Sequence, residues 1–224
     1  MPSGRGEGWG ISGVLGVSGT AGLAGAFIES GWLWLCGLCF HARVNIESSG
    51  VPDERPSRWV RHRADGDVEE CVRVLAEVHA RDGYPVNWPA QPGEWLSRGP
   101  LLGSWVAELE GGLVGHVSLS RGGEGDLAPT LWSERNGATR DTTAVVSRLF
   151  VAPQARGRRI GALLIGQAVE EARRRGLHPV LDVVASDTAA AALYERLGWE
   201  LMATVEQRWS PHQTVVIRCY AAPS

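Results

Sequence analysis

Residues 149–164 have the sequence LFVAPQARGRRIGALL, in which an arginine-rich turn joins an apolar run to an amphipathic segment. The apolar run from Thr143 to Val151 is nearly continuous, as expected of a buried strand. The segment after the turn places four apolar residues on one helical face: Ile160, Leu164, Ala168 and Ala172. We therefore expect a strand, a turn and a helix that runs from about Arg158 to Arg175 and ends at Gly176.

The sequence after Gly176 continues the same pattern. Val180 to Ala185 is a second apolar strand, so strand, helix and strand form a βαβ unit with parallel strands. Asp187 can cap a short helix through Leu197, which Gly198 ends. Two more strands, Glu200–Trp209 and Thr214–Tyr220, complete the chain.

The turn itself has the chemistry of a phosphate site. A helix start offers unpaired backbone N–H groups and the positive end of a dipole. Arg156, Arg158 and Arg159 add charge for more than one phosphate. The alternative is a solvated basic turn. Two nucleotide-binding motifs are absent: G-x-x-x-x-G-K-[ST], which needs a lysine that this chain lacks, and G-x-G-x-x-G after this strand.

The upstream part predicts an antiparallel meander with one helix. Asp67 and Glu70 have the spacing of a capping box before a helix that ends near Asp82-Gly83. The remaining expectations are a strand at 59–63, an irregular loop with at most one short helix at 84–102, a hairpin of strands 105–110 and 113–120, and a polar loop at 121–141.

Taken together, these segments resemble the GNAT superfamily of acetyl-CoA-dependent N-acetyltransferases. The matching pieces follow in the family's order: Leu149 to Val151, Arg156 to Gly161, Val180 to Ala185, and the helix AAAALYERLGW at 189–199. The resemblance implies an α/β (α+β) fold. It has a mixed, mostly antiparallel sheet with a central, splayed parallel strand pair and helices on both faces.

The resemblance also implies where acetyl-CoA binds as co-substrate. The pantetheine arm would lie along Leu149, Phe150 and Val151, and Tyr194 would act as general acid. The pyrophosphate would lie at the turn: Arg156, Gly157, Arg158, Arg159, Ile160, Gly161 and Ala162. Asp187 would also reach the cofactor.

Two positions depart from the family pattern. Arg159 stands where the pattern has its first glycine, and a side chain fits there without strain only if φ is negative. Asp187 stands where the family often has an asparagine. An ionised carboxylate cannot donate a hydrogen bond, so Asp187 is left with the role of a helix cap.

The acceptor and the general base stay open. His116 and Glu108 are candidate bases on the predicted hairpin. Tryptophans and acids in the 84–102 and 121–141 loops suit a cationic amine, either a small molecule or a peptide. The alternative function is a non-catalytic acyl-CoA-binding sensor or scaffold of the same fold.

Composition bounds the class of protein. The chain has 224 residues, 44% hydrophobic and 21% charged, enough for one well-cored domain. The net charge of −3 gives no reason to expect nucleic acid. Cys36 and Cys39 form a C-x-x-C without a second pair, so we expect no metal and reduced thiols in a cytoplasmic protein. A homodimer is left open.

Residues 1–56 differ from the rest and form a glycine-rich, apolar extension without caps or a clear period. We expect this extension to be poorly ordered and the N-acetyltransferase domain to span 57–224. Three interpretations are weighed: translated sequence upstream of a later natural start, a membrane segment and a signal peptide. The first is preferred, so a membrane role is not expected.

Overall fold

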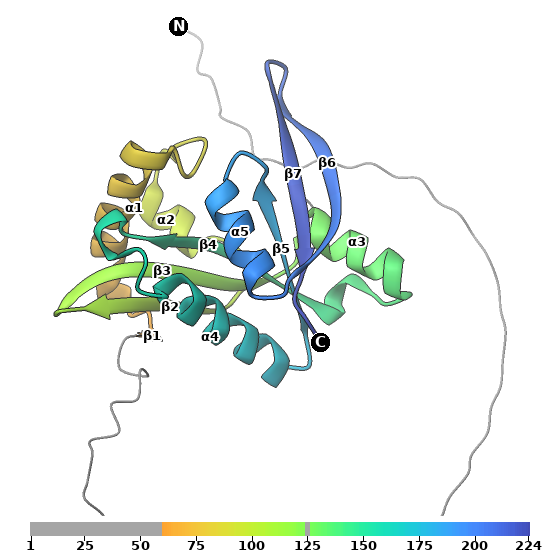
Figure 1. The fold of residues 1–224 in the computed structure, drawn as a ribbon, viewed down its shortest axis with the longest axis horizontal. Helices are drawn as coiled ribbons and strands as arrows, with labels where there is room; N and C mark the ends of the chain where they lie inside the picture. The colour runs from red at the N-terminus through yellow and green to blue at the C-terminus, as the bar shows by residue number, and fades with distance from the viewer. Residues whose placement is uncertain (1–59, 124–125) are drawn as a thin grey trace, which may run out of the picture. The chain divides into compact units, whose positions relative to one another are not determined.

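A computed structural model describes residues 60–123 and 126–224, and the predicted extension at 1–56 lies outside them. One seven-stranded sheet forms the centre, in the order β1-β2-β3-β4-β5-β7-β6 (Figure 1). The strands are β1 (Val60–His62), β2 (Leu101–Leu109), β3 (Gly112–Arg121), β4 (Thr143–Val151), β5 (His178–Val184), β6 (Glu200–Ser210) and β7 (Gln213–Ala221).

All neighbouring strands are antiparallel except β4 and β5, which are parallel. The parallel pair lies between the β1–β4 meander and the β6–β7 hairpin. A parallel pair needs a crossover connection, which here is the helix predicted after the arginine-rich turn. The predicted mixed, mostly antiparallel sheet with a central parallel pair is confirmed.

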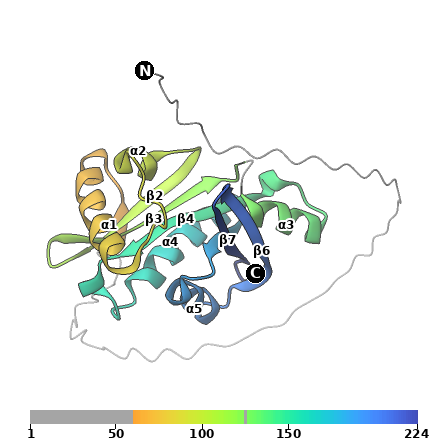
Figure 2. The same ribbon diagram turned by 90° about the horizontal axis from the view of Figure 1, so that it is seen from above.

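Helices cover both faces of the sheet. They are α1 (Val68–Asp82), α2 (Pro92–Ser97), α3 (Leu127–Asn136), α4 (Ile160–Arg174) and α5 (Thr188–Arg196), with single 3-10 turns η2 (Asp65–Asp67), η3 (Arg140–Thr142) and η4 (Pro153–Ala155). A Cβ added to Gly115 would lie 3.0 Å from Leu164 of α4, so β3 faces α4 there. The next residue, His116, points to the opposite face, where Arg63 links it to the Leu96 carbonyl of α2. Figure 2 shows α1 and α2 over the β2–β4 end of the sheet and α3 beside β6 and β7.

Helix α4 follows the sequence pattern closely. The four predicted stripe residues are all buried, with Ile165 beside them. Gly176 follows the helix with φ +70°, a conformation that favours glycine. Near the end of the helix, the Glu171 carboxylate pairs with both Arg174 and Arg175.

Helix α3 corrects the prediction of a polar loop at 121–141. Its sequence LAPTLWSERN has no continuous apolar stripe, which is why pattern analysis missed it. Its first two backbone N–H groups donate to the Asp182 carboxylate of β5, at 3.0 Å each. The cap therefore comes from a distant strand, and Gly137 ends the helix with φ +61°.

The predicted capping box at the start of α1 is also wrong. The Asp67 carboxylate accepts from the Ala64 N–H and pairs with Arg61, while Glu70 pairs with Arg73. Because the Asp67 carboxylate is paired with Arg61, it does not cap α1.

Among the described residues, no helix is both long and apolar enough to cross a membrane.

Candidate functional site

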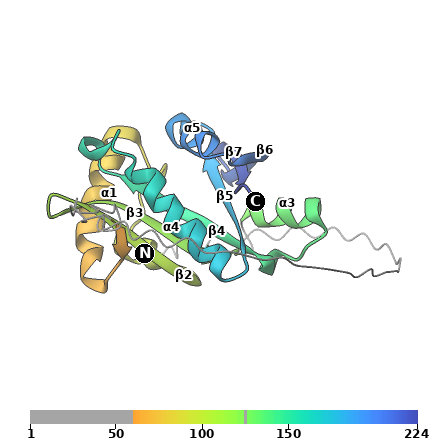
Figure 3. The same ribbon diagram turned by 60° about the horizontal axis from the view of Figure 1, so that its bottom comes forward.

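The site begins where the parallel strands separate. Within the described chain, β4 and β5 pair only over three positions, from Thr143 with His178 to Val145 with Val180. β4 then continues to Val151, while β5 continues alongside β7 as far as Val184 opposite Ile217. Figure 3 shows β5 rising away from β4 toward α5. The splay predicted for this pair is present, and it exposes one edge of β4.

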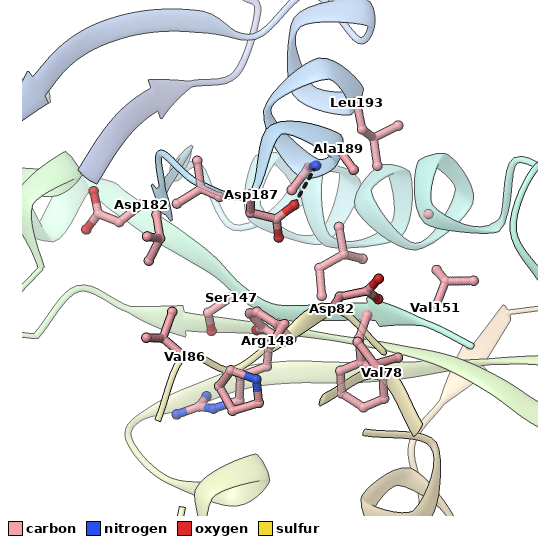
Figure 4. A pocket seen from close by; sticks show the side chains of 18 of the residues that line it. Val78, Asp82, Val86, Ser147, Arg148, Val151, Asp182, Asp187, Ala189 and Leu193 are labelled. Atoms are coloured by element: carbon pink, nitrogen blue, oxygen red, sulfur yellow. Dashed lines mark hydrogen bonds between the residues drawn. The ribbon is translucent and has the colours of Figure 1, made fainter. Parts of the chain in front are cut away.

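A cleft of about 1860 Å³ opens at this split. Its walls come from β4, β5, the start of α4, α5, the chain that follows α1, and the β6–β7 hairpin. Figure 4 shows side chains from these separate segments that line the cleft, among them Asp82, Arg148 and Asp187. Open sheets place their ligands at such strand ends.

The arginine-rich turn forms one end of the cleft. Gly157 has φ +78° and Arg159, the residue before α4, has φ +62°. The condition of a negative φ at Arg159 is therefore not met: Arg159 keeps the backbone that a glycine would adopt, at a cost of roughly 1–2 kcal/mol. No described side chain caps α4, so the N–H groups of its first turn are available to an anion.

The three arginines of the turn have different surroundings. Arg156 is held by the Asp82 carboxylate at the end of α1 and also donates to the Val151 carbonyl. This hydrogen-bonded pair holds the pKa of Asp82 below its usual range. Arg158 lies 3.7 Å from Glu110, at the β2–β3 turn. Arg159 lines the cleft.

The structure brings nearly all the predicted site residues together. Those that line the cleft are Leu149, Phe150, Val151, Arg156, Gly157, Arg159, Ile160, Gly161, Ala162, Asp187 and Tyr194. Arg158 is the one predicted site residue that does not line the cleft. The Asp187 carboxylate accepts from the Ala190 N–H at 3.0 Å, so the expected cap of α5 is present.

Tyr194 projects from α5 into the core side of the cleft. Its side chain is only 6% exposed and packs against Trp199 and Tyr220, with ring centroids 5.8 and 5.9 Å away. Burial raises the pKa of the Tyr194 phenol above its ordinary range. The phenol therefore stays protonated at neutral pH, which is the form that can donate a proton.

Several lining residues were missed by sequence analysis. Tyr84, Ser147, Arg148 and Asp182 all line the cleft, as does Trp95, one of the tryptophans of the 84–102 loop that were expected to suit the acceptor. A signal existed for three of them, because Ser147-Arg148 and Asp182 are polar interruptions in otherwise apolar strands. Burial raises the pKa of the Asp182 carboxyl and also that of the Tyr84 phenol.

The two candidate bases lie elsewhere. His116 is completely buried, Arg63 donates to its Nε2 (3.3 Å), and its Nδ1 donates to the Arg148 carbonyl (3.0 Å). Burial lowers the pKa of His116 to about 3. Glu108 accepts from Arg61 at 2.8 Å on the β1–β2 side. Neither is among the described residues that line the cleft, so direct contact of either with a substrate there is not expected, and the general base stays unassigned.

The cysteines of the described segments are structural. Cys71 and Cys219 are buried free thiols, and burial raises the pKa of each. No group of three or more potential metal ligands occurs within 60–123 and 126–224. The C-x-x-C at Cys36 and Cys39 lies outside these segments.

Three features meet in this cleft: the split between the parallel strands, the uncapped start of α4 and the buried phenol of Tyr194. The model of the acetyltransferase (GNAT) family matches residues 70–199. This chain belongs to the GNAT family of acetyltransferases.

Individual relatives agree with this assignment. An uncharacterized N-acetyltransferase of Methanocaldococcus jannaschii is 31% identical over 146 residues, which are 63% of this chain and 60% of that protein. The chain thus spans about 60% of the length of this curated relative.

Solved structures share the fold. The acetyltransferase yncA of Salmonella typhimurium, determined with its cofactor acetyl-CoA, is 18% identical with a TM-score of 0.53, over 72% of this chain and 91% of that one. A GCN5-related N-acetyltransferase from Kribbella flavida is 22% identical with a TM-score of 0.55, over 74% and 96% of the two chains.

Proposed function

We propose that this protein transfers the acetyl group of acetyl-CoA to a primary amine of a small molecule or peptide. The observation that carries the proposal is the uncapped start of α4, which opens into the same cleft as the Tyr194 side chain. An anion site and a proton donor in one cleft are what acyl transfer from a phosphate-bearing thioester requires.

The described residues fit the co-substrate in three respects. The first-turn N–H groups of α4 and the Arg159 side chain suit the pyrophosphate. The edge of β4 that β5 leaves exposed suits the pantetheine amides, which can pair with Leu149 to Val151. The cleft volume of about 1860 Å³ leaves room for an acceptor as well.

The chemistry needs one bond made and one broken. The acceptor nitrogen forms the new N–C bond, and the C–S bond breaks with its electron pair moving to sulfur. A β4 backbone N–H can stabilise the oxyanion that forms at the carbonyl. Tyr194 supplies the proton that the leaving thiolate takes up, and the proton lost by the amine passes to solvent, from which Tyr194 is protonated again. Because burial keeps Tyr194 protonated, the donor is in the correct state at neutral pH.

Release of free CoA from acetyl-CoA in the presence of a panel of amines and peptides tests the proposal. We expect thiol release with at least one amine, and a product whose mass is increased by one acetyl group. Tight CoA binding without thiol release would instead support an acyl-CoA-binding sensor or scaffold.

Tyr194→Phe tests the assigned acid within that assay. The variant loses only the hydroxyl, so CoA affinity should be retained while turnover falls roughly 10²–10⁴-fold. Since the pKa of Tyr194 is raised, native activity should not decline through ionisation of this phenol between pH 7 and 10. Full activity in Tyr194→Phe would mean that the thiolate leaves without this donor. Tyr220→Phe is the matched control, because Tyr220 donates to Glu195.

A further inference from the structure

Arg148 has an unusual backbone on β4. His116 is opposite Phe150 and Ser118 is opposite Ser147, so Arg148 and Leu149 together oppose Val117 in a β-bulge. Arg148 has φ +52°, in the left-handed region that a side chain rarely adopts. A bulge redirects a side chain, and such strain persists only where the surroundings impose it. Here the His116 ring donates to the Arg148 carbonyl at 3.0 Å and holds the bulge in place.

The guanidinium of Arg148 is only partly satisfied. One terminal nitrogen donates to the Arg98 carbonyl at 3.0 Å, and the group lies 5.3 Å from the centre of the Trp95 ring. Its Nε is buried without a hydrogen-bond partner among residues 60–123 and 126–224, and so is the Oγ of its neighbour Ser147. Both atoms are covered in the structure, but both residues line the cleft, so an occupant that draws in either side chain would meet an unpartnered donor.

The charge of Arg148 has no ion-pair partner within the described chain, and Asp126 is the one carboxylate whose charge favours it there. Burial lowers the pKa of Arg148, and the positive charges of Arg63 and Arg98 add to that effect. An arginine nevertheless stays protonated in proteins. A partly buried cation beside two like charges is costly until an anion enters, and the planar guanidinium matches a carboxylate.

We propose that Arg148 and Ser147 form a subsite for a carboxylate, so that the acceptor is a small amine carrying a carboxylate, such as a free amino acid. This proposal rests on the proposed function and specifies its substrate class. In Figure 4 Arg148 and Ser147 lie on β4, with the acids Asp182 and Asp187 across the cleft. The cation of Arg148 on one wall and the Asp187 carboxylate on the other suit a zwitterion, with its carboxylate toward β4 and its amine toward α5.

Matched acceptors test the subsite. The native chain is assayed with amino acids and with their carboxamides, which keep the amine and lose the negative charge. We expect KM to be lower for the amino acid, roughly 10- to 100-fold, the range of a hydrogen bond to a charged group. Arg148→Gln should remove this difference by raising KM for the amino acid alone. Arg148→Lys keeps the positive charge but not the two parallel N–H donors of a guanidinium, so it should retain part of the KM difference between the amino acid and its carboxamide.

The control is Arg208→Gln, an exposed arginine on β6 that should leave both KM values unchanged. CoA affinity and the thermal midpoint of each variant establish that it is folded. If Arg148→Gln does not fold, Ser147→Ala provides the second variant, and it should reduce the KM difference between the amino acid and its carboxamide by a smaller amount. Equal KM values for the two members of each pair in the native chain, or a difference that survives in Arg148→Gln, would overturn the proposal. So would a preference for peptide amines that does not depend on a carboxylate.

A binding measurement separates this proposal from the proposed function. Calorimetry on the CoA-saturated protein compares an N-acetylated amino acid with its carboxamide. A preference for the carboxylate that Arg148→Gln abolishes supports the subsite even if no amine is acetylated. Absence of that preference overturns it even if acetylation occurs.

Discussion

Arg158 and Arg159 are adjacent in the chain yet have different surroundings. Arg159 lines the cleft at the start of α4, whereas Arg158 lies near Glu110. Arg159→Gln should therefore weaken CoA binding roughly 10-fold or more at low salt, since it removes a charge-assisted contact with phosphate. Arg158→Gln removes the same charge and should change affinity less than about threefold. Titration calorimetry at two salt concentrations measures both.

The salt dependence adds a second criterion. The difference between the two variants should shrink at about 0.5 M salt, because screening weakens long-range attraction to the phosphates. Equal losses in the two variants would mean that the net charge of the turn matters and the position of each guanidinium does not.

His116 links stability to pH. Its pKa is lowered from 6.5 to about 3 in the folded chain, so the folded state keeps the ring neutral while the unfolded state binds a proton below pH 6.5. The contribution of the neutral His116 ring to the free energy of unfolding is fully present above pH 6.5 and is lost as the pH falls toward 3. At pH 5 the free energy of unfolding should be lower by roughly 2 kcal/mol. Urea unfolding at pH 7 and pH 5 measures the loss.

The variant His116→Gln should lose stability at pH 7, because Arg63 and the Arg148 carbonyl lose their partner, but it should show a smaller decrease between pH 7 and pH 5. His212→Gln, in the exposed β6–β7 turn, is the control and should behave as the native chain. An unchanged pH slope in His116→Gln would show that other groups govern acid unfolding.

At the scale of elements, α3 depends on a strand that is distant in sequence. Asp182 of β5 accepts from the first two backbone N–H groups of α3, across 55 and 54 positions of the chain. Asp182→Ala should cost about 1–2 kcal/mol, the upper range for loss of a helix cap. Hydrogen exchange should accelerate in the first turn of α3, while α4 keeps its protection.

Asp65→Ala, in the exposed 3-10 turn before α1, is the matched control, since it removes an acid without removing a cap. Faster exchange throughout the sheet in Asp182→Ala would indicate a general loss of packing. An unchanged rate in α3 would contradict the role of Asp182 as its cap.

At the scale of the whole chain, the described residues form a core of their own. That core joins α1, α4 and α5 to both sides of the sheet, from Cys71 to Ala222. A truncated variant beginning near Val51 should therefore fold, with the unfolding midpoint and CoA affinity of the full chain. Differential scanning calorimetry and titration calorimetry compare the two. An insoluble or unfolded variant would place the domain boundary earlier than residue 57.

Much of the fold follows from the sequence alone. The strand Thr143–Val151, the stripe of α4 and the glycine after it depend on residues within a few positions of one another, so local periodicity is sufficient to find them. The βαβ order then requires a parallel pair, and the motif residues from Leu149 to Tyr194 place the cleft at its split. The helix start at the arginine-rich turn, with its unpaired N–H groups, is likewise predicted from neighbouring residues alone.

Only the tertiary structure decided which polar residues face the cleft and which are buried beneath it. Asp182 lies far along the chain from the helix that it caps, and His116 is buried because Arg63 and the Arg148 carbonyl surround it. The bulge that directs Arg148 into the cleft exists only through its pairing with β3. Such contacts depend on long-range register and burial, which set pKa values and side-chain direction and leave no periodic trace in the sequence.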